Sequence, residues 1–513
     1  MSTETAGDVE IRHGETRSGL DAWKLAELPV PPASRGLSLL GIIGPGAIIL
    51  GASIGSGEWL LGPATFVKYG LALLWVTTLA VFFQTVLNTE VIRYTLYTGE
   101  PAFTGFMRTK PHSTFWAWVY AILFFLQTGW PGWAGASAGA FFYLAMGRPS
   151  TGADATTIYR IGVGAFLLCV AILVFSGKRI ERTLEILNWT MIVFILGSLL
   201  LLCFIFAAPD HWLGTLLGFG GYDLEARKFN LIPEGADWFL LSAFAAYSGA
   251  GGMVNITLSN WARDKGFGMG KVVGYIPSAV GGQTVKLAHS GSIFRTTADS
   301  LKSWSQWWRI IQVDQWGVFF IGAILGMGLP AVLYTALFES HQDIRDTNMA
   351  AALAARIASR GAIFPFLIAL MSVWVLFKTQ LDVIEGMVRA ITDILWSGSR
   401  RLREWRRSDV RIIYYTVLAA IVIWGLLALR LPPIGLLQLG ANVAGLGMVI
   451  SSLHILRVNT HLLPPELRPP MWRRIALVGM SLFYGFFVYL WLMGGIAPDP
   501  EKGFLFNMRR YLS

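Results

Sequence analysis

Long apolar segments recur along this chain of 513 residues, and they constrain its fold more than any other feature. Each segment is long enough to cross the roughly 30 Å of hydrocarbon in a bilayer as a helix. Only 14% of the residues are charged, whereas soluble proteins have about a quarter. Because a lipid-exposed backbone must satisfy its hydrogen bonds within the segment, the segments are predicted to be helices. The sequence therefore predicts an all-α polytopic membrane protein with about 11 transmembrane helices.

The apolar segments also define the organisation of the chain. The predicted spans cover residues 38–69, 71–93, 114–146, 158–176, 188–208, 237–262, 315–338, 362–396, 411–430, 434–456 and 474–495. The corresponding regions are a cytoplasmic N-terminal tail at 1–37, five spans at 38–208, an external loop at 209–236, five spans at 237–459 with a long cytoplasmic loop near 263–314, and an eleventh span with the C-terminal tail at 460–513. A short interfacial helix is expected around Trp23.

Basic residues indicate the orientation of the chain. With the N-terminus inside, most of the 41 Lys and Arg residues fall in inside segments, which is the distribution that the positive-inside rule describes. This predicts a multi-pass protein of the plasma (inner) membrane with a cytoplasmic N-terminus and an external C-terminus. Basic loops also account for the net charge of +10, so the lipid bilayer is an expected partner and nucleic acid is not.

The first span is interrupted by Gly55, Ser56, Gly57 and Glu58. Each glycine costs about 1 kcal/mol in a helix interior relative to alanine, and serine offers competing local hydrogen bonds. These residues therefore predict an unwound turn with an acid beside it. An ionisable group at bilayer depth is expensive and marks a functional site by default. The alternative is that Glu58 caps the exposed N–H groups of its own half-helix.

A second interruption, Ser248–Gly252, begins the sixth span. The first span of each five-span set is thus broken, which is typical of inverted-repeat transporters whose site lies between the breaks. Close helix packing through small residues is the alternative for each break. The candidate substrate-binding residues are Glu58, Gly55, Ser56, Tyr247, Ser248, Gly252, Met253 and Asn255, together with Gln438 and Asn442 of the tenth span.

Several charged residues lie within spans. Lys378 and Asp382 of the eighth span are four residues apart, as are Glu385 and Arg389, so each pair shares a helix face. Glu90 lies toward the inner half of the second span. One interpretation is a salt-bridged lining near the cytoplasmic vestibule. The other is a gating or proton pathway that consists of Lys378, Asp382, Glu385 and Glu90.

Other polar and aromatic residues have simpler interpretations. Gln84 is predicted to hydrogen-bond to neighbouring helices, and Gln127 precedes "GWPGW", whose proline is predicted to kink the third span. The tryptophans of "SWSQWW" are expected at the lipid headgroup level. The sequence contains no nucleophile–base–orienter set, HExxH motif or Walker loop. An enzyme is therefore not expected, and neither is a resident cofactor.

The stretches "GPGAIILGASIGSGEW" and "YGLALLWVTTLAVFFQTVLNTEVIRYT" resemble the start of the Nramp family of divalent metal transporters. The resemblance implies the LeuT-type fold, an inverted repeat of helices 1–5 and 6–10 with helices 1 and 6 unwound at mid-membrane. It also implies metal bound between the unwound parts and uptake coupled to protons. Where the family has Asp-Pro-Gly-Asn, this chain has Gly55-Ser56-Gly57-Glu58. Where the family has Met-Pro-His, the local match is Gly252-Met253-Val254, followed by Asn255.

These departures change the expected cargo. Glu58 and Asn255 are the metal-ligand candidates that remain, and both offer oxygen, the ligand that hard cations prefer. We expect a secondary-active transporter that moves a divalent cation by alternating access, with Mg²⁺ favoured over Fe²⁺ or Mn²⁺ because the usual Asp, Met and His ligands are missing. The same groups suit a small polar or cationic organic solute, which is the alternative cargo. A third hypothesis is a membrane sensor that retains the fold without transporting.

Overall fold

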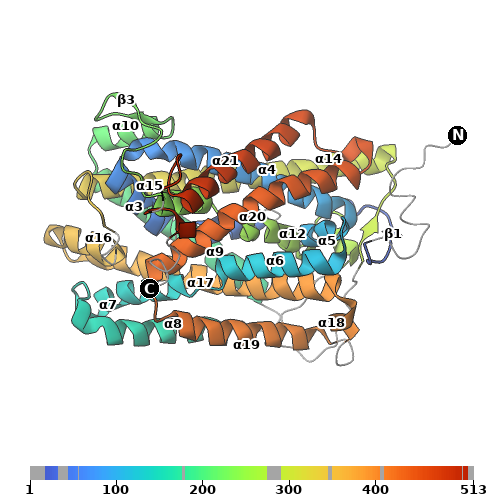
Figure 1. Ribbon diagram of the computed structural model, residues 1–513, viewed down its shortest axis with the longest axis horizontal. Coiled ribbons are helices and arrows are strands. Elements are labelled where there is room, and N and C mark those ends of the chain that lie inside the picture. The colour runs from blue at the N-terminus through green and yellow to red at the C-terminus, as the bar shows by residue number, and fades with distance from the viewer. Residues whose placement is uncertain are drawn as a thin grey trace.

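The computed structural model describes residues 18–32, 44–55, 57–175, 180–273, 290–344, 349–404, 409–499 and 501–506, which form a bundle of helices (Figure 1). Among these residues, eight helices are long and apolar enough to cross a membrane. The first, third and sixth predicted spans each consist of two shorter helices that meet at a break. The prediction of a polytopic all-α membrane protein is therefore confirmed.

The first five transmembrane helices come from the N-terminal half, and we number them one to five. Helix one comprises α2 (Pro45–Ser53), the π-helical turn η2 (Gly57–Leu61) and α3 (Gly62–Tyr69); helix two comprises η3 (Leu71–Leu73) and α4 (Leu74–Thr98); helix three comprises α6 (Ser113–Thr128) and α7 (Gly132–Met146); helix four is α8 (Ala155–Phe175) and helix five is α9 (Ile180–Phe206). Short elements in this half are α5 (Ala102–Met107), η4 (Gly152–Asp154) and α10 (Pro209–Gly218).

The second set repeats the pattern of a broken first member. Helix six comprises α11 (Trp238–Tyr247) and α12 (Met253–Asp264); helix seven comprises α14 (Ala298–Gln312), η6 (Val313–Phe320) and α15 (Ile321–Leu337); helices eight to eleven are α17 (Ile363–Gly398), α19 (Val410–Ala428), α20 (Pro433–His461) and α21 (Met471–Met493). The remaining elements are β1 (Lys24–Leu25), β2 (Tyr222–Asp223), β3 (Lys228–Phe229), α13 (Gly270–Val273), β4 (Ser292–Ile293), α16 (Met349–Ile357), η7 (Ala358–Arg360), α18 (Arg400–Glu404) and η9 (Pro465–Leu467).

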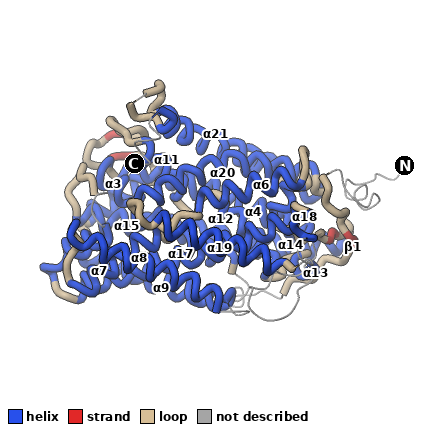
Figure 2. Tube along the Cα trace, turned by 60° about the horizontal axis from the view of Figure 1, so that its bottom comes forward, coloured by secondary structure: helices blue, strands red, loops and turns tan. Residues whose placement is uncertain are grey.

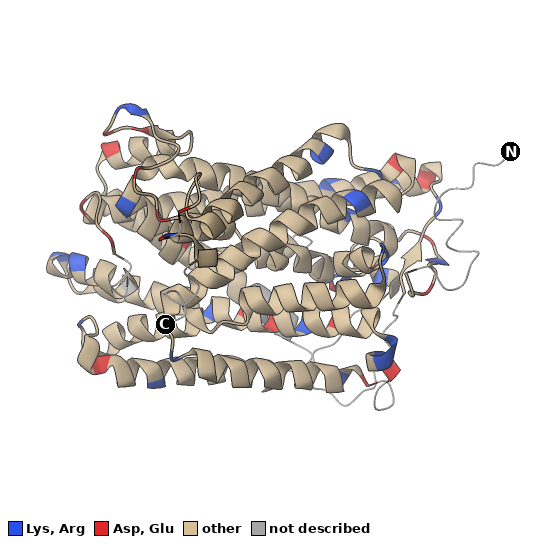
Figure 3. Cartoon of the chain, viewed as in Figure 1, with Lys and Arg blue, Asp and Glu red and all other residues tan. Residues whose placement is uncertain are grey.

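The connecting segments gather at the two ends of the bundle. β1, α5, α14 and α18 lie at one end, which we call the β1 end, and α10, β3 and α16 lie at the other, the α10 end (Figure 1). Figure 2 shows most loops, in tan, at these two ends. Segments that were predicted from the sequence to lie on the same side of the membrane thus lie at the same end of the bundle. Figure 3 shows that many of the Lys, Arg, Asp and Glu residues lie toward these two ends.

The break in helix one follows α2, which ends at Ser53. The chain then turns tightly, because the Gly55 N–H donates to the Ser53 carbonyl at 2.6 Å. The helix resumes as a π-helical turn at Gly57. The predicted unwinding is confirmed. Glu58 lies inside the π-helical turn, so it belongs to a segment whose backbone hydrogen bonds are irregular.

The break in helix six depends on three glycines. Gly249, Gly251 and Gly252 have φ values of +95°, +79° and +60°. Residues with a β-carbon rarely adopt this conformation, whereas glycine adopts it at little cost. The chain can therefore leave α11 after Tyr247 and enter α12 at Met253 without strain. The predicted break at Ser248–Gly252 is confirmed.

The N-terminal segment differs from its prediction. Trp23 lies beside a strand, not in an interfacial helix, because β1 pairs in parallel with β4 of the loop that follows helix six. The Trp23 side chain is buried and lies over the Arg108 guanidinium at 4.6 Å. We call residues 18–32 the N-terminal strap, because they cross the β1 end of the bundle and contact the loops there.

Helix seven starts earlier than predicted. A continuous helix begins at Ala298, so part of the predicted loop near 263–314 is helical. The tryptophans of this part were expected at the headgroup level. That depth stays a prediction. The structure shows that Trp304 and Trp307 are buried against the protein, and that the Trp307 indole donates to the carbonyl of Pro29 in the strap at 2.8 Å. Burial of one face against the strap explains why this amphipathic segment is helical.

Candidate functional site

The two helix breaks are in direct contact with each other. Gly57 of η2 lies against the carbonyl of Tyr247, the last residue of α11. A β-carbon added to Gly57 would lie only 1.7 Å from that carbonyl oxygen. Because no side chain fits there, glycine is required for the unwound parts of helices one and six to meet.

Glu58 lies at this contact and is buried, with 1% of its surface exposed. The Gly249 N–H donates to Glu58 Oε1 at 3.3 Å, and the N–H groups of Gly55 and Glu58 itself approach the same carboxylate. The acid thus caps exposed N–H groups at both breaks. Its other oxygen, Oε2, is buried with no hydrogen-bond partner among the described residues. Burying a carboxylate oxygen without a hydrogen-bond partner costs free energy. An oxygen left in this state is typical of a group that binds a ligand.

Two glutamines hold the interrupted backbone of helix six. Gln84 of α4 accepts from the Gly251 N–H at 3.1 Å and donates to the Ser248 carbonyl at 2.8 Å. Gln127 of α6 accepts from the Met253 N–H at 2.7 Å and donates to the Gly251 carbonyl at 3.0 Å. Each side-chain amide therefore donates and accepts as a peptide group would. In this way the irregular backbone is satisfied at membrane depth, where no lipid group could do so.

A small cavity adjoins the break in helix six. Its volume is about 10 Å³, which is room for about one water molecule. Its walls come from helices one, three, six and eight: Ser53, Thr128, Trp133, Tyr247, Gly249, Ala250, Val254 and Val383. Gly249 lines the cavity and also donates to Glu58, so one backbone group connects the acid to the cavity, although Glu58 is not itself a lining residue.

The predicted residues near the breaks have defined contacts. Tyr247 lines the cavity, and its hydroxyl donates to the Gln127 carbonyl at 3.4 Å. Ser248 donates to the Phe244 carbonyl at 2.8 Å, so it reinforces the end of α11. Gly252 lies against Gln127, where a β-carbon would be 2.2 Å from the amide oxygen. Gly55 forms the turn after α2. Ser56 falls outside the described residues.

The other predicted substrate-binding residues lie away from the cavity. The Met253 side chain reaches α20, where a β-carbon on Gly447 would be 2.7 Å from the methionine methyl group. Asn255 donates to the side chains of Gln84 at 3.3 Å and of Asn88 at 2.9 Å. Asn442 donates to the carbonyl of Phe239 at 3.0 Å, and Gln438 is buried on the same helix, α20. Among the described residues, no group of three or more His, Cys, Asp or Glu side chains is placed to hold a metal ion.

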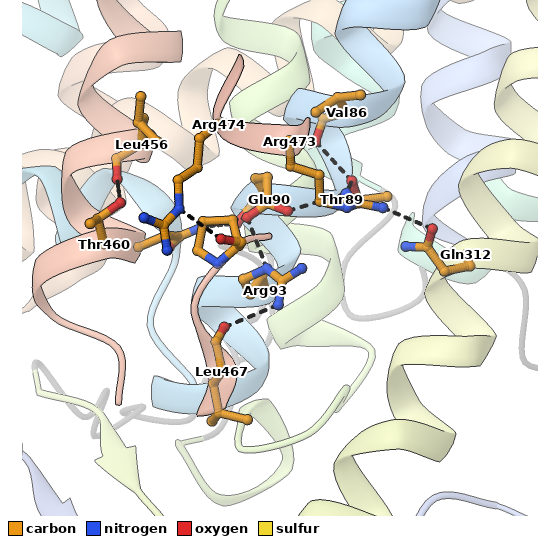
Figure 4. Close-up of polar contacts among 12 residues, drawn as sticks. Val86, Thr89, Glu90, Arg93, Gln312, Leu456, Thr460, Leu467, Arg473 and Arg474 are labelled. Atoms are coloured by element: carbon orange, nitrogen blue, oxygen red, sulfur yellow. Dashed lines mark hydrogen bonds and ion pairs between the residues drawn. The ribbon is translucent and has the colours of Figure 1, made fainter. Parts of the chain in front are cut away.

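Glu90 lies in a charge cluster near the β1 end (Figure 4). Arg93 donates to its carboxylate at 2.8 Å, Arg473 at 3.1 Å and Asn459 at 3.0 Å. The Trp308 ring lies 4.0 Å from the Arg93 guanidinium and 5.0 Å from that of Arg473. Two arginines thus pair with one buried carboxylate, and the cluster joins helices two, seven, ten and eleven.

The part of α17 toward the β1 end carries a second charge network. Arg389 pairs with Glu385 of the same helix and with Asp264 of α12, the latter at 3.2 Å. Arg263 of α12 pairs with Asp264 at 2.8 Å and with Asp393 of α17 at 2.9 Å. These pairs hold the second half of helix six against helix eight. Nearer the start of α17, Lys378 contacts Asp382 of the same helix and Asn188 of α9.

Comparison with solved structures decides the fold. Structures of the Eremococcus coleocola manganese transporter superpose on this chain. One of them is a complex with an aromatic bis-isothiourea substituted compound. It gives a TM-score of 0.62 at 14% identity and covers 95% of each chain. This chain has the fold of that transporter. Two mutants of the same protein, a histidine-to-alanine and a glutamate-to-glutamine variant, give TM-scores of 0.61 and 0.60 at 15% identity, covering 96% of this chain and 95% of theirs. No family model and no curated protein sequence matches the chain.

Sequence reasoning missed several residues that form the site. Gln127 was interpreted only through the kink that follows it, yet its amide bridges the break in helix six. Ser53, Thr128 and Trp133 line the cavity and were not singled out. The available signal was a polar Gln-Thr pair in an apolar span directly before the "GWPGW" break.

Proposed function

We propose that this protein is a secondary-active transporter that moves a divalent metal cation by alternating access around the paired breaks of helices one and six. The observation that carries the proposal is the carboxylate of Glu58, buried where the two breaks meet, with one oxygen bound to Gly249 and the other without a partner among the described residues. A cation that reaches this place gains an anionic ligand and backbone groups that the breaks have released.

The ligand chemistry favours a hard cation such as Mg²⁺ over Fe²⁺ or Mn²⁺. The groups at the breaks are carboxylate, hydroxyl, amide and backbone oxygens, which hard cations prefer. The softer candidate ligand, Met253, packs on α20 instead. The two cysteines are buried elsewhere, with their thiols directed at backbone carbonyls. The cavity of about 10 Å³ suits a single ion better than an organic solute.

Alternating access requires that each side of the site can open. The cavity has room for only about one water molecule in this structure, and we take the network of Arg263, Asp264, Glu385, Arg389 and Asp393 as the gate at the β1 end. The β1 end is cytoplasmic in this proposal, because it contains the Arg-rich segments. Opening would part α12 from α17 while the Glu90 cluster keeps helix two bound to helices ten and eleven.

Uptake by the purified protein in proteoliposomes tests the proposal and its rival. We expect time-dependent influx of Mg²⁺, weaker influx of Mn²⁺, and stabilisation of the detergent-purified protein by millimolar Mg²⁺. A small organic amine that stabilises the protein and is taken up, with no response to either metal, would favour the organic-solute alternative. Binding without flux in any arm would favour the sensor hypothesis. Influx with an imposed inward proton gradient, compared with no gradient, tests proton coupling.

A further inference from the structure

A lysine ammonium is enclosed between three transmembrane helices, away from the cavity. Lys378 of α17 is buried, with 2% of its side chain exposed. Its ammonium contacts a carboxylate oxygen of Asp382 on the same helix and the amide oxygen of Asn188 on α9. Burial of a charged amine in a membrane protein is costly unless partners replace its hydration shell. Here one carboxylate and one amide oxygen do so.

Helix one lies directly against this group. A β-carbon added to Gly51 of α2 would be 1.8 Å from the Asn188 amide oxygen and 3.1 Å from the Lys378 ammonium nitrogen. Only glycine therefore lets the first half of helix one approach so closely. Gly51 precedes Ser53, which lines the cavity, by two residues. The ammonium thus lies where helices one, five and eight meet, next to the part of helix one that ends at the break.

The oxygens around the ammonium are those that bind a small hard cation. Carboxylate and amide oxygens are the usual ligands of hard metal ions. A second carboxylate oxygen, Asp382 Oδ1, is buried and has no partner among the described residues. The side chain of Asp382 is 4% exposed, so bulk water does not hydrate it. One carboxylate oxygen and one amide oxygen therefore converge on the ammonium, and the second oxygen of the same carboxylate lies buried beside them without a partner among the described residues.

We propose that Asn188 and Asp382 form an alkali-cation site that the ammonium of Lys378 fills from within the chain. The lysine holds helices one, five and eight together in place of a free ion. The wild-type protein accordingly needs no sodium to keep this junction closed. The proposal goes beyond the proposed function, because it concerns a cation that stays in place and not the one that is transported.

Shortening the lysine tests the proposal. In Lys378→Ala the site is vacated while Asp382 and Asn188 remain, so a free Na⁺ or Li⁺ can enter. We expect the melting temperature of the full-length detergent-purified variant to be roughly 2 °C higher in sodium or lithium chloride than in choline chloride. Lys378→Met fills the same volume without a charge, and the double variant Lys378→Ala/Asp382→Asn removes the anionic ligand. Neither control is expected to distinguish the salts, and nor is the wild type.

Equal melting temperatures of Lys378→Ala in the three salts would overturn the proposal and leave an ordinary buried ion pair. Absence of this variant from cell membranes would also contradict it, because intracellular Na⁺ and K⁺ would fill a vacated cation site. A sodium response that persists in the double variant would place the ion elsewhere. Because these readouts measure stability, they are independent of whether the protein transports Mg²⁺.

Discussion

The side chains of Gln84 and Gln127 replace peptide groups where helix six is interrupted. Each amide accepts from one backbone N–H and donates to one carbonyl of the break. An unsatisfied buried donor or acceptor costs about 1–3 kcal/mol. The break is therefore tolerated at membrane depth only because these two residues lie on the helices that face it.

Replacing either glutamine by leucine removes two of these hydrogen bonds at once. We expect Gln84→Leu and Gln127→Leu each to lower the free energy of unfolding by about 2–4 kcal/mol, since two backbone groups lose their partners. Thermal unfolding of the purified protein measures the effect. Gln438→Leu is the matched control, because the Gln438 side-chain nitrogen has no partner among the described residues. An equal loss of unfolding free energy in all three variants would contradict this account of the break.

Sequence could identify the polar residues at membrane depth but not their partners. Glu58, Gln84 and Gln127 stand out in apolar spans without any structure. Their partners are not visible in the sequence, because successive residues of a helix point about 100° apart and the rotation of each span is set by its neighbours. Met253 and Asn255 illustrate this limit. They are close to the break in sequence, but their side chains reach α20 and α4.

At the scale of elements, the contact between the two breaks depends on Gly57. We expect Gly57→Ala to lower the melting temperature and to reduce transport strongly, because its methyl group would overlap the Tyr247 carbonyl and force the breaks apart. Overpacking of this kind costs about 1–3 kcal/mol or more. Gly197→Ala on α9 is the control, since nothing lies within 4 Å of that position, and alanine favours a helix. A Gly57→Ala protein with wild-type stability and transport would show that the breaks need not touch.

The N-terminal strap is held by an ion pair outside the membrane. Arg108 pairs with Glu100 at 2.5 Å, donates to the carbonyl of Asp21 in the strap at 3.1 Å and lies under the ring of Trp23. Burial alone would raise the pKa of Glu100, but the charge and hydrogen bonds of Arg108, with those of Tyr94 and Gly291, lower it below its ordinary value of 4.5. The carboxylate therefore stays ionised and keeps the strap bound at neutral pH.

This shift predicts the pH dependence of the strap. Because the pKa of Glu100 is lower in the folded protein than in the unfolded chain, its stabilisation is complete well above pH 4.5 and is lost as the pH falls through the lowered value. We expect the free energy of unfolding of the wild type to exceed that of Glu100→Gln by about 3 kcal/mol at pH 7. This difference should shrink below pH 4.5. Thermal unfolding across this range measures it. Glu404→Gln, which breaks an exposed pair with Arg400, is the control and should change little. A pH-independent difference would contradict the assignment.

The strap could not be predicted from sequence for a clear reason. Two-residue strands carry no periodicity, and Lys24 pairs with Ser292, which is far away in the chain. The breaks could be predicted because glycine acts on its own backbone. Local conformation was therefore accessible from residue types, whereas a pairing between distant segments required the folded chain.

At the scale of the whole molecule, hydropathy alone predicts that successive loops alternate between the two ends of the bundle. Each span must cross the bilayer, so successive loops lie on opposite sides, and the structure gathers them at the β1 and α10 ends (Figure 1). The orientation of the ends depends on charge and remains a prediction. Native Cys169 and Cys203 are both buried, which leaves introduced cysteines as clean reporters.

Labelling with a membrane-impermeant maleimide on intact cells tests the orientation. Arg227 at the α10 end and Arg401 at the β1 end are both exposed. We expect Arg227→Cys to react on intact cells and Arg401→Cys to react only after permeabilisation, because basic segments stay inside. The unmodified protein should not react in either condition. The reverse labelling pattern would show that the topology is inverted. The gate network, which includes Arg263 and Asp393, would then lie on the external side.

The most direct test of the central claim is Mg²⁺ influx into proteoliposomes that contain wild type or Glu58→Gln at matched, verified levels of folded protein. Glutamine keeps the shape and the contact with Gly249 but removes the charge that would attract a divalent ion. We predict loss of at least about tenfold in influx, equivalent to about 1.4 kcal/mol of lost stabilisation, with a melting temperature close to that of wild type. Undiminished Mg²⁺ and Mn²⁺ influx in Glu58→Gln would contradict the claim that cargo passes by this acid.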